Sequence, residues 1–225
     1  MDEREPDAVT DGAFFHVPAA LPRGRHGLSR EEVLAAQRER AMIAVTELLA
    51  AHGVDGIGVR DVAKRAGLSL SAFYAIFADK QECVFAAYDR FIGVLLTRLV
   101  EVRAEGRSWE EYVHDVVAAY FDTLAADLVV ARAFQVAMDA LGAPARARRR
   151  ESLTAMADLL QAKHRDWDAD AAAALPASAY LAGVYGVRQL ASDTLDDPAG
   201  RPLAEIAAEA TAWVALLYGA AGQSK

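Results

Sequence analysis

The sequence predicts an all-α protein with a small N-terminal head and a larger helical body. Apolar residues recur at the three- and four-residue spacing of amphipathic helices, and Ser-x-x-Glu capping signals precede several of these stretches. No stretch alternates polar and apolar residues as a half-buried strand would. With 225 residues, the chain is long enough for a small domain joined to a larger one.

The first predicted helix begins after Ser29, which has Glu32 at capping-box spacing, and ends at Gly53. The next two are short, at 59–66 and 70–77. Between these two helices, Gly67 suits a left-handed turn and Ser69 suits a helix cap. A long fourth helix is predicted from Asp79 to about residue 103, because Asp79 and Glu82 repeat the capping spacing.

Five more helices are predicted in the body, which makes about nine in all. Their expected ranges are 109–125, 127–141, 145–165, 177–195 and 202–220. In the fourth of these, Gly183 and Gly186 stand among branched apolar residues, so another helix is expected to approach closely there. We therefore predict a flexible arm at 1–27, a helix-turn-helix domain at 28–80 and a helical effector-binding and dimerisation domain at 81–225.

The charge is unevenly distributed, although the net charge is −8. Residues 1–20 carry five acids and one base, and residues 81–225 carry twenty acids and fourteen bases. Residues 21–80 carry nine bases and seven acids, a net charge of +2. A mildly basic head on an acidic body is typical of a protein that applies one end to phosphate.

The stretch "GVRDVAKRAGLSLSAFYAIF", residues 58–77, has the requirements of a helix-turn-helix. It offers a packed first helix, a Gly turn and a second helix exposed along one face. We expect Phe73 and Phe77 to point inward, and Arg60, Lys64 and Arg65 to point toward solvent.

Residues 38–91 resemble the tetracycline-repressor (TetR) family of bacterial transcription regulators. The residues that carry the resemblance are Ala63, Ala66, Gly67, Ser69, Tyr74, Phe77 and Lys80. The resemblance implies a homodimer that places two recognition helices in successive major grooves of a double-stranded operator. It also implies dimerisation through helices near the C-terminus and an effector pocket in the body.

Carried over from the family, Tyr74 and Lys80 are expected to contact phosphates, and Arg60 to approach one from the preceding helix. Ser69 is expected to cap the recognition helix and face the DNA backbone. Such contacts position a protein without specifying sequence. The sequence departs from the family pattern at Gly58, Ser71, Ala72 and Ile76.

Few side chains in the recognition helix can read bases. Of its exposed positions only Ser71 can hydrogen-bond a base edge, while Leu70 and Ala75 suit thymine methyl groups. We hypothesise that Arg23 and Arg25 of the arm add contacts in an A·T-rich minor groove. The alternative for the arm is a solvated basic linker.

In the body, large side chains predict an apolar effector pocket, although they also suit an ordinary core. The candidates are Trp109, Tyr112, Phe121, Phe134 and Met138. Apolar stripes on the last two helices predict the dimer interface, with packing inside one chain as the alternative. The interface candidates are Tyr180, Leu181, Val184, Val187, Leu203, Ile206, Ala210, Trp213, Val214 and Leu217.

No catalytic or metal-binding constellation stands out, and no cofactor is expected. The five histidines are scattered, and Cys83 lies in an apolar helical pattern that favours packing in a reducing compartment. No apolar run is long enough to cross a membrane, so the cytoplasm is the expected location.

The leading hypothesis is a ligand-responsive dimeric repressor released from DNA by a small apolar effector. One alternative is an all-α small-molecule-binding protein or enzyme whose helix-turn-helix no longer binds DNA. Another is an activator, or a DNA-binding regulator without an effector.

Overall fold

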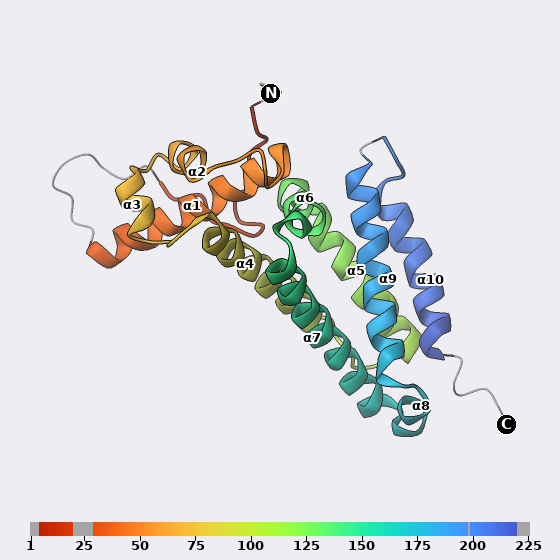
Figure 1. Ribbon diagram of the computed structural model, residues 1–225. Helices are drawn as coiled ribbons and strands as arrows, with labels where there is room; N and C mark the ends of the chain where they lie inside the picture. The colour runs from red at the N-terminus through yellow and green to blue at the C-terminus, as the bar shows by residue number, and fades with distance from the viewer. Residues whose placement is uncertain (1–4, 20–28, 198, 220–225) are drawn as a thin grey trace. The chain divides into compact units, whose positions relative to one another are not determined.

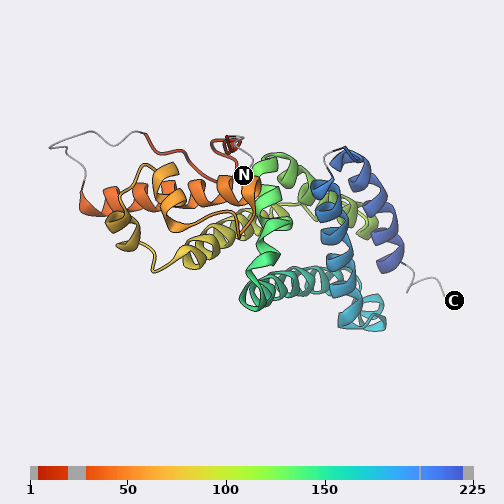
Figure 2. The same ribbon diagram turned by 45° about the horizontal axis from the view of Figure 1, so that its top comes forward.

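The computed structural model describes residues 5–19, 29–197 and 199–219, and these residues contain ten α-helices, one 3-10 helix and no β-strand. The all-α prediction is confirmed. The described residues divide into two compact units, which Figures 1 and 2 show from two sides. The N-terminal unit extends to Phe91 and includes Ala126–Leu141, and the second unit holds Ile92–Ala125 and the chain from Gly142 onward.

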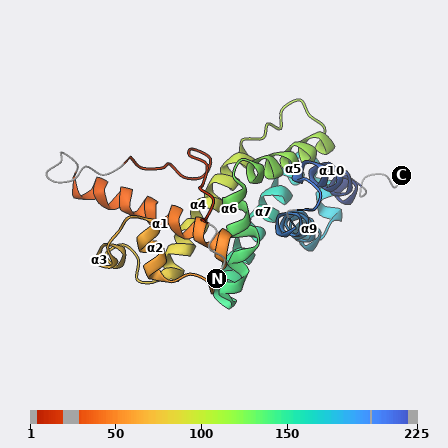
Figure 3. The same cartoon turned by 90° about the horizontal axis from the view of Figure 1, so that it is seen from above.

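The N-terminal unit is built around α1, Arg30–His52. Its capping box is present as predicted, since Ser29 Oγ accepts from the Glu32 amide and Glu32 Oε2 accepts from the Ser29 amide. Every residue from Ala41 to Leu49 is buried. Against α1 pack α2 (Val59–Arg65), α3 (Leu70–Tyr74), α6 (Leu128–Gln135) and the 3-10 helix Ala137–Leu141, and Figure 3 shows the arrangement of the four α-helices.

Residues 5–19 also pack in this unit. Val9, Phe14 and Phe15 are buried, and the Phe14 ring lies 5.4 Å from that of Phe91. The prediction of a flexible arm therefore does not describe these fifteen residues, because they carry apolar side chains that the core accommodates. Residues 20–28, with Arg23 and Arg25, lie outside the described part of the chain.

The second unit is formed by α-helices alone among the described residues. It holds the second half of α4 (Lys80–Val100), together with α5 (Trp109–Ala125), α7 (Ala143–Trp167), α8 (Ala169–Ala174), α9 (Ala177–Asp196) and α10 (Leu203–Gly219). α10 packs on α5 and α9, and α7 packs on α9 and α8. Figure 1 shows α9 and α10 running side by side in opposite directions.

Domain boundaries differ from those that the sequence predicts. α6 and the 3-10 helix follow α5 in the chain, yet they belong to the N-terminal unit, where the Phe134 ring lies 5.9 Å from Tyr88 and 5.4 Å from Phe91. The predicted helix at 127–141 is two helices, and α8 was not predicted. Asp168, which caps α8 by accepting from the Asp170 and Ala171 amides, is the local signal for that helix.

Two glycines of α9 allow the close approach of α10. A Cβ on Gly186 would lie 2.9 Å from the Trp213 ring, and one on Gly183 would collide with the Tyr218 hydroxyl group. Tyr218 is 1% exposed and its hydroxyl donates to the Tyr180 carbonyl oxygen at 3.1 Å, so it has little room to move. The predicted close helix approach is thus made within one chain.

Gly183→Ala is expected to lower the free energy of unfolding by about 1–3 kcal/mol, because the added methyl group overpacks the contact between α9 and α10. Gly93→Ala in α4 is the matched control, since no heavy atom lies within 4 Å of a Cβ there. That substitution is expected to raise stability by about 0.5–1 kcal/mol through the better helix propensity of alanine. Urea unfolding measures both, and equal effects of the same sign would contradict the assigned contact.

Candidate DNA-binding site and body cavity

α2 and α3 form the predicted helix-turn-helix. The turn passes through Gly67, whose φ of 67° is the left-handed conformation that favours glycine, and the Leu68 amide donates to the Ala63 carbonyl at 2.8 Å. Val62, Ala63, Phe73 and Phe77 are buried. Packing of this inner face on α1 leaves the opposite face of α3 free to meet a partner.

The exposed face of α3 has the composition that the sequence predicts. Leu70 is 38% exposed and Tyr74 is 56% exposed, and Ser71 and Ala75 are exposed as well. Ser69 caps the helix, since its Oγ accepts from the Ala72 amide at 3.1 Å. Ala72 is half-buried. The face therefore presents two hydroxyl groups, a phenol and small apolar groups, and no charged side chain from within α3.

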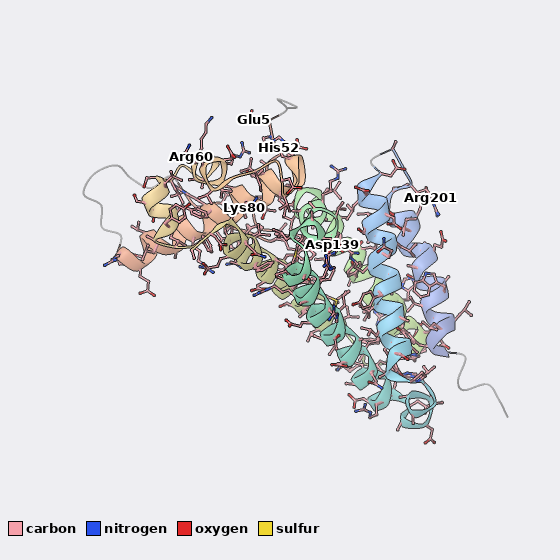
Figure 4. All side chains as sticks on the ribbon, in the orientation of Figure 1. Glu5, His52, Arg60, Lys80, Asp139 and Arg201 are labelled. Atoms are coloured by element: carbon pink, nitrogen blue, oxygen red, sulfur yellow. The ribbon has the colours of Figure 1, made fainter. Side chains whose placement is uncertain are left out.

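Asp61 and Arg60 are the charged side chains at the start of α2, where an anion such as phosphate would bind. Gly58 caps the helix without a side chain, and Asp61 Oδ2 accepts from the Gly58 amide at 2.8 Å. Arg60 is exposed, and Figure 4 shows it pointing away from the head. Its guanidinium group is thus available to a partner.

Lys80 is held by the chain itself. Its Nζ donates to the carbonyl oxygens of Val54 and Ile57, each at 2.7 Å, in the connection between α1 and α2. The ammonium group therefore fixes the segment that leads into α2. The family role of a phosphate contact remains a prediction for this residue, and the geometry adds a positioning role that the sequence did not indicate.

The prediction that Arg65 points toward solvent is wrong. Its Nε donates to Glu47 Oε2 at 2.7 Å, and Glu47 is only 5% exposed. The hydrogen bond that Arg65 donates to Glu47 is the main reason that the pKa of Arg65 is raised. Sequence reasoning missed this ion pair because Glu47 stands on the buried side of a helix eighteen residues earlier, where no local pattern connects the two.

The five predicted effector-pocket residues are divided between the two units. Trp109 and Tyr112 belong to an aromatic cluster with Trp167 and His164. Phe121 is 2% exposed and packs edge-on against Tyr120. Phe134 and Met138 are buried in the N-terminal unit. Tyr112, Phe121, Phe134 and Met138 are buried and Trp109 is half-buried, and the pocket that they would share stays a prediction.

The second unit contains a cavity of about 60 Å³ elsewhere. Its wall is almost wholly apolar, although the side chain of Arg188 contributes to it. The lining residues are Leu99, Val117, Tyr120, Leu153, Met156, Leu160, Gly183, Val184, Val187, Arg188, Val214 and Tyr218. None of the five predicted pocket residues is among them, because the volume lies between α4, α5, α7, α9 and α10, and only the packing of these helices defines it.

Half of the predicted dimer-interface residues are used inside the chain. Leu181, Val184, Leu203, Trp213 and Leu217 remain half-buried. The buried ones are Tyr180, Val187, Ile206, Ala210 and Val214. The outward faces instead carry Tyr185, which is 41% exposed, and Leu216, which is 73% exposed.

The comparisons with known proteins agree with this geometry. Residues 44–87 match the sequence model described as "Bacterial regulatory proteins, tetR family". No curated protein matches the sequence. A transcriptional regulator from Rhodococcus sp. is similar in structure, with 26% identity, a TM-score of 0.65 and coverage of 81% of this chain and 96% of that one.

Two fatty acid regulators have the same fold. The fatty acid degradation regulator FadR from Bacillus halodurans has 17% identity and a TM-score of 0.66, and the match covers 79% of this chain and 94% of that one. FadR from Bacillus subtilis, solved in complex with stearoyl-CoA, has 17% identity and a TM-score of 0.67 over 78% of this chain and 96% of that one.

The described part of the chain is all-helical with an N-terminal helix-turn-helix, and the match of residues 44–87 supports a DNA-binding transcriptional regulator. The resemblance seen in the sequence is confirmed, since residues 44–87 match the model of the tetR family of bacterial regulatory proteins. The similar proteins whose functions are named are regulators rather than enzymes.

Two further features are absent from the described residues. They hold no group of three or more His, Cys, Asp or Glu side chains placed to bind a metal ion. None of their helices is both long and apolar enough to cross a membrane.

His164 is a buried titratable group in the aromatic cluster. It is 2% exposed, stacks on Trp109 at 4.2 Å and shares a 2.6 Å hydrogen bond between its Nδ1 and the Tyr180 hydroxyl. Burial lowers the pKa of His164, an effect that nearby Asp168 opposes. Because the folded-state pKa lies below the usual value, folding favours the neutral ring, and this contribution is lost as the pH falls.

Between about pH 8 and about pH 5, the protein is therefore expected to lose stability on acidification, and His164→Phe is expected to lose less. The phenyl ring preserves the stacking on Trp109 but does not titrate. Urea unfolding at several pH values measures the difference between the two proteins. Parallel pH profiles would show that His164 does not contribute.

Proposed function

We propose that this protein is a dimeric transcriptional repressor that binds a double-stranded DNA operator and is released by a small apolar effector. The observation that supports this proposal most directly is the helix-turn-helix. Phe73 and Phe77 hold α3 on α1, and Leu70, Ser71, Tyr74 and Ala75 are exposed. The division of labour follows the predicted domains, with DNA binding in the head and effector binding and dimerisation in the body. The proposed location is the cytoplasm, where operator DNA is found.

DNA anchoring is assigned to the polar groups around α3. Ser69, Tyr74 and Arg60 face outward and are proposed to contact phosphates, which position the protein on the duplex. Base reading is assigned to Ser71 and to methyl contacts from Leu70 and Ala75. Ala72, which is half-buried in the same helix, is included among the proposed DNA-binding residues. Arg23 and Arg25 remain candidates for added minor-groove contacts. A variant that begins at Leu28 would lack both arginines, but it would also lack the packed residues Phe14 and Phe15.

Dimerisation is proposed for the outward faces of α9 and α10. Ala204, Ala208, Ala212 and Leu216 are spaced by four residues on α10 and leave one face of it small and apolar. On α9, Ala182 and Tyr185 are exposed, and half-buried Leu181, Trp213 and Leu217 complete the surface. A two-fold pairing of these faces would bury apolar side chains that are otherwise left in water.

The effector is proposed to enter the cavity of the second unit. A volume of about 60 Å³ is smaller than the roughly 300–1,000 Å³ of ligand pockets, so an effector must favour a conformation in which the cavity is wider. The apolar wall favours a hydrocarbon chain. The similarity to a FadR solved with stearoyl-CoA supports acyl compounds as the first class to test.

An alternative activity is small-molecule binding without DNA recognition, because α3 offers few base-reading groups. Salt-sensitive DNA binding separates the two functions. Footprinting on genomic DNA around the protein's own gene provides the duplex for this test, since regulators of this family commonly control adjacent genes. The alternative would be supported if the footprint shows no protected DNA site and if any residual DNA binding does not weaken as the salt concentration rises.

Arg60→Met is expected to weaken binding to the footprinted duplex and to reduce the slope of log K against log salt by about 0.9 for each phosphate that the variant no longer neutralises. Its free energy of unfolding should stay unchanged, because Arg60 is exposed. Fluorescence anisotropy at increasing KCl concentrations measures the slope.

Lys80→Met is the comparison variant. It is expected to lower the free energy of unfolding by about 1–3 kcal/mol, because the Val54 and Ile57 carbonyls lose their donor. A reduced salt slope at unchanged stability would instead assign Lys80 to a phosphate.

Stearoyl-CoA and stearate are expected to raise the melting temperature and to release the footprinted duplex. Val184→Trp, which fills the cavity, should abolish both effects while DNA binding persists. Val100→Trp is the matched control, since Val100 is 59% exposed and does not line the cavity. Thermal shift and anisotropy are the measurements. Stabilisation by these probes without DNA release would argue against effector control of DNA binding.

A further inference from the structure

Residues 5–19 form a segment, here called the strap, that neither DNA binding nor effector binding explains. It follows α1 in the opposite direction, as Figures 2 and 3 show. A turn at Gly12, with φ of 80°, lets the Gly12 amide donate to the Phe15 carbonyl at 2.8 Å. Phe15 is 1% exposed and Phe14 is 4% exposed, so the strap is a packed part of the head.

One attachment joins the strap to the helix-turn-helix. The Val9 amide donates to Glu47 Oε1 at 3.1 Å, and Arg65 of α2 donates to Glu47 Oε2 at 2.7 Å. Arg65 also reaches the Glu5 carboxylate and the Pro6 carbonyl, each at 3.3 Å. The Glu47 carboxylate thus accepts from the strap and from α2 at the same time.

The next residue of the strap makes the second attachment, to α6. The Thr10 amide donates to Asp127 Oδ2 at 2.6 Å, and Asp127 is 2% exposed. The other oxygen, Oδ1, caps α6 by accepting from the Val129 and Val130 amides at 3.0 and 3.1 Å. One carboxylate therefore holds both the strap and the first turn of α6.

The two attachments use neighbouring backbone amides, because Val9 and Thr10 are consecutive. Only the φ and ψ angles of Val9 lie between the two amide groups, so a shift of α6 that keeps its bond to Thr10 displaces the Val9 amide once it exceeds what these two angles absorb. α6 in turn follows α5, which lines the cavity with Val117 and Tyr120. Aromatic packing adds a parallel contact, with Phe91 lying 5.4 Å from both Phe14 and Phe134.

We propose that the strap is a clamp that couples the position of α6 to that of α2 and so belongs to the regulatory mechanism of this protein. Its regulatory use rests on the proposed function, but the coupling itself is a property of the free head. A strap that only filled space would bury Phe14 and Phe15 without bonding α2 and α6 from adjacent residues.

Hydrogen–deuterium exchange on the full-length protein without DNA tests the clamp. Asp127→Asn retains a side chain that can cap α6 but places an amide group where Thr10 requires an acceptor. It is expected to make exchange about tenfold faster in α6 and in residues 59–74, the helix-turn-helix. Arg65→Met removes the attachment at the other end, and it is likewise expected to make exchange faster in α2 and also in α6.

The matched control is Asp168→Asn, which alters the cap of α8 in the second unit and has no bond to the strap. It should leave α2 and α6 unchanged, and α10 serves as an internal reference for global unfolding. Effects that stay local to α6 in one variant and to α2 in the other would overturn the clamp, whether or not the protein binds DNA. Coupled exchange in a protein that protects no DNA would leave the clamp in place and refute the proposed function.

Discussion

Between Ala41 and Leu49, α1 is buried on every side, and the geometry of the head depends on this. Because other elements surround this part of the helix, its polar side chains Thr46 and Glu47 are buried as well. The Thr46 hydroxyl donates a hydrogen bond to the Met42 carbonyl oxygen. The buried Glu47 carboxylate needs hydrogen-bond donors from other elements. Arg65 and the Val9 amide provide them, so a buried carboxylate fixes the register of α2 and of the N-terminal segment on α1. Loss of either partner would leave a charge poorly compensated in the core.

In this fixed head, one set of side chains places α3 and a different set is exposed on its outward face. Phe73 and Phe77 hold α3 by apolar packing, Ser69 caps it, and Lys80 secures the segment before α2 through two carbonyl oxygens. The outward face is then left with hydroxyl groups, a phenol and small apolar side chains. Such a face suits a protein that gains affinity from the DNA backbone and gains selectivity from a few methyl and hydroxyl contacts.

In the body, the packing of α10 on α9 depends on two glycines. Gly183 and Gly186 bring α10 close enough for Tyr218 and Trp213 to pack over α9, and this approach uses apolar residues that otherwise read as a dimer surface. The remaining cavity is small and apolar.

The sequence by itself determined the fold class, most helix positions and the helix-turn-helix. The predicted helix at 109–125 is observed with the same ends, because capping residues and apolar spacing are local properties of the chain. Tertiary structure alone decided that α6 joins the head, that Arg65 turns inward to Glu47, and which apolar residues of α9 and α10 stay exposed. The cavity lining was likewise beyond sequence reasoning. Each of these features depends on contacts between residues far apart in the chain, and periodicity shows which face of a helix is apolar but not what covers it.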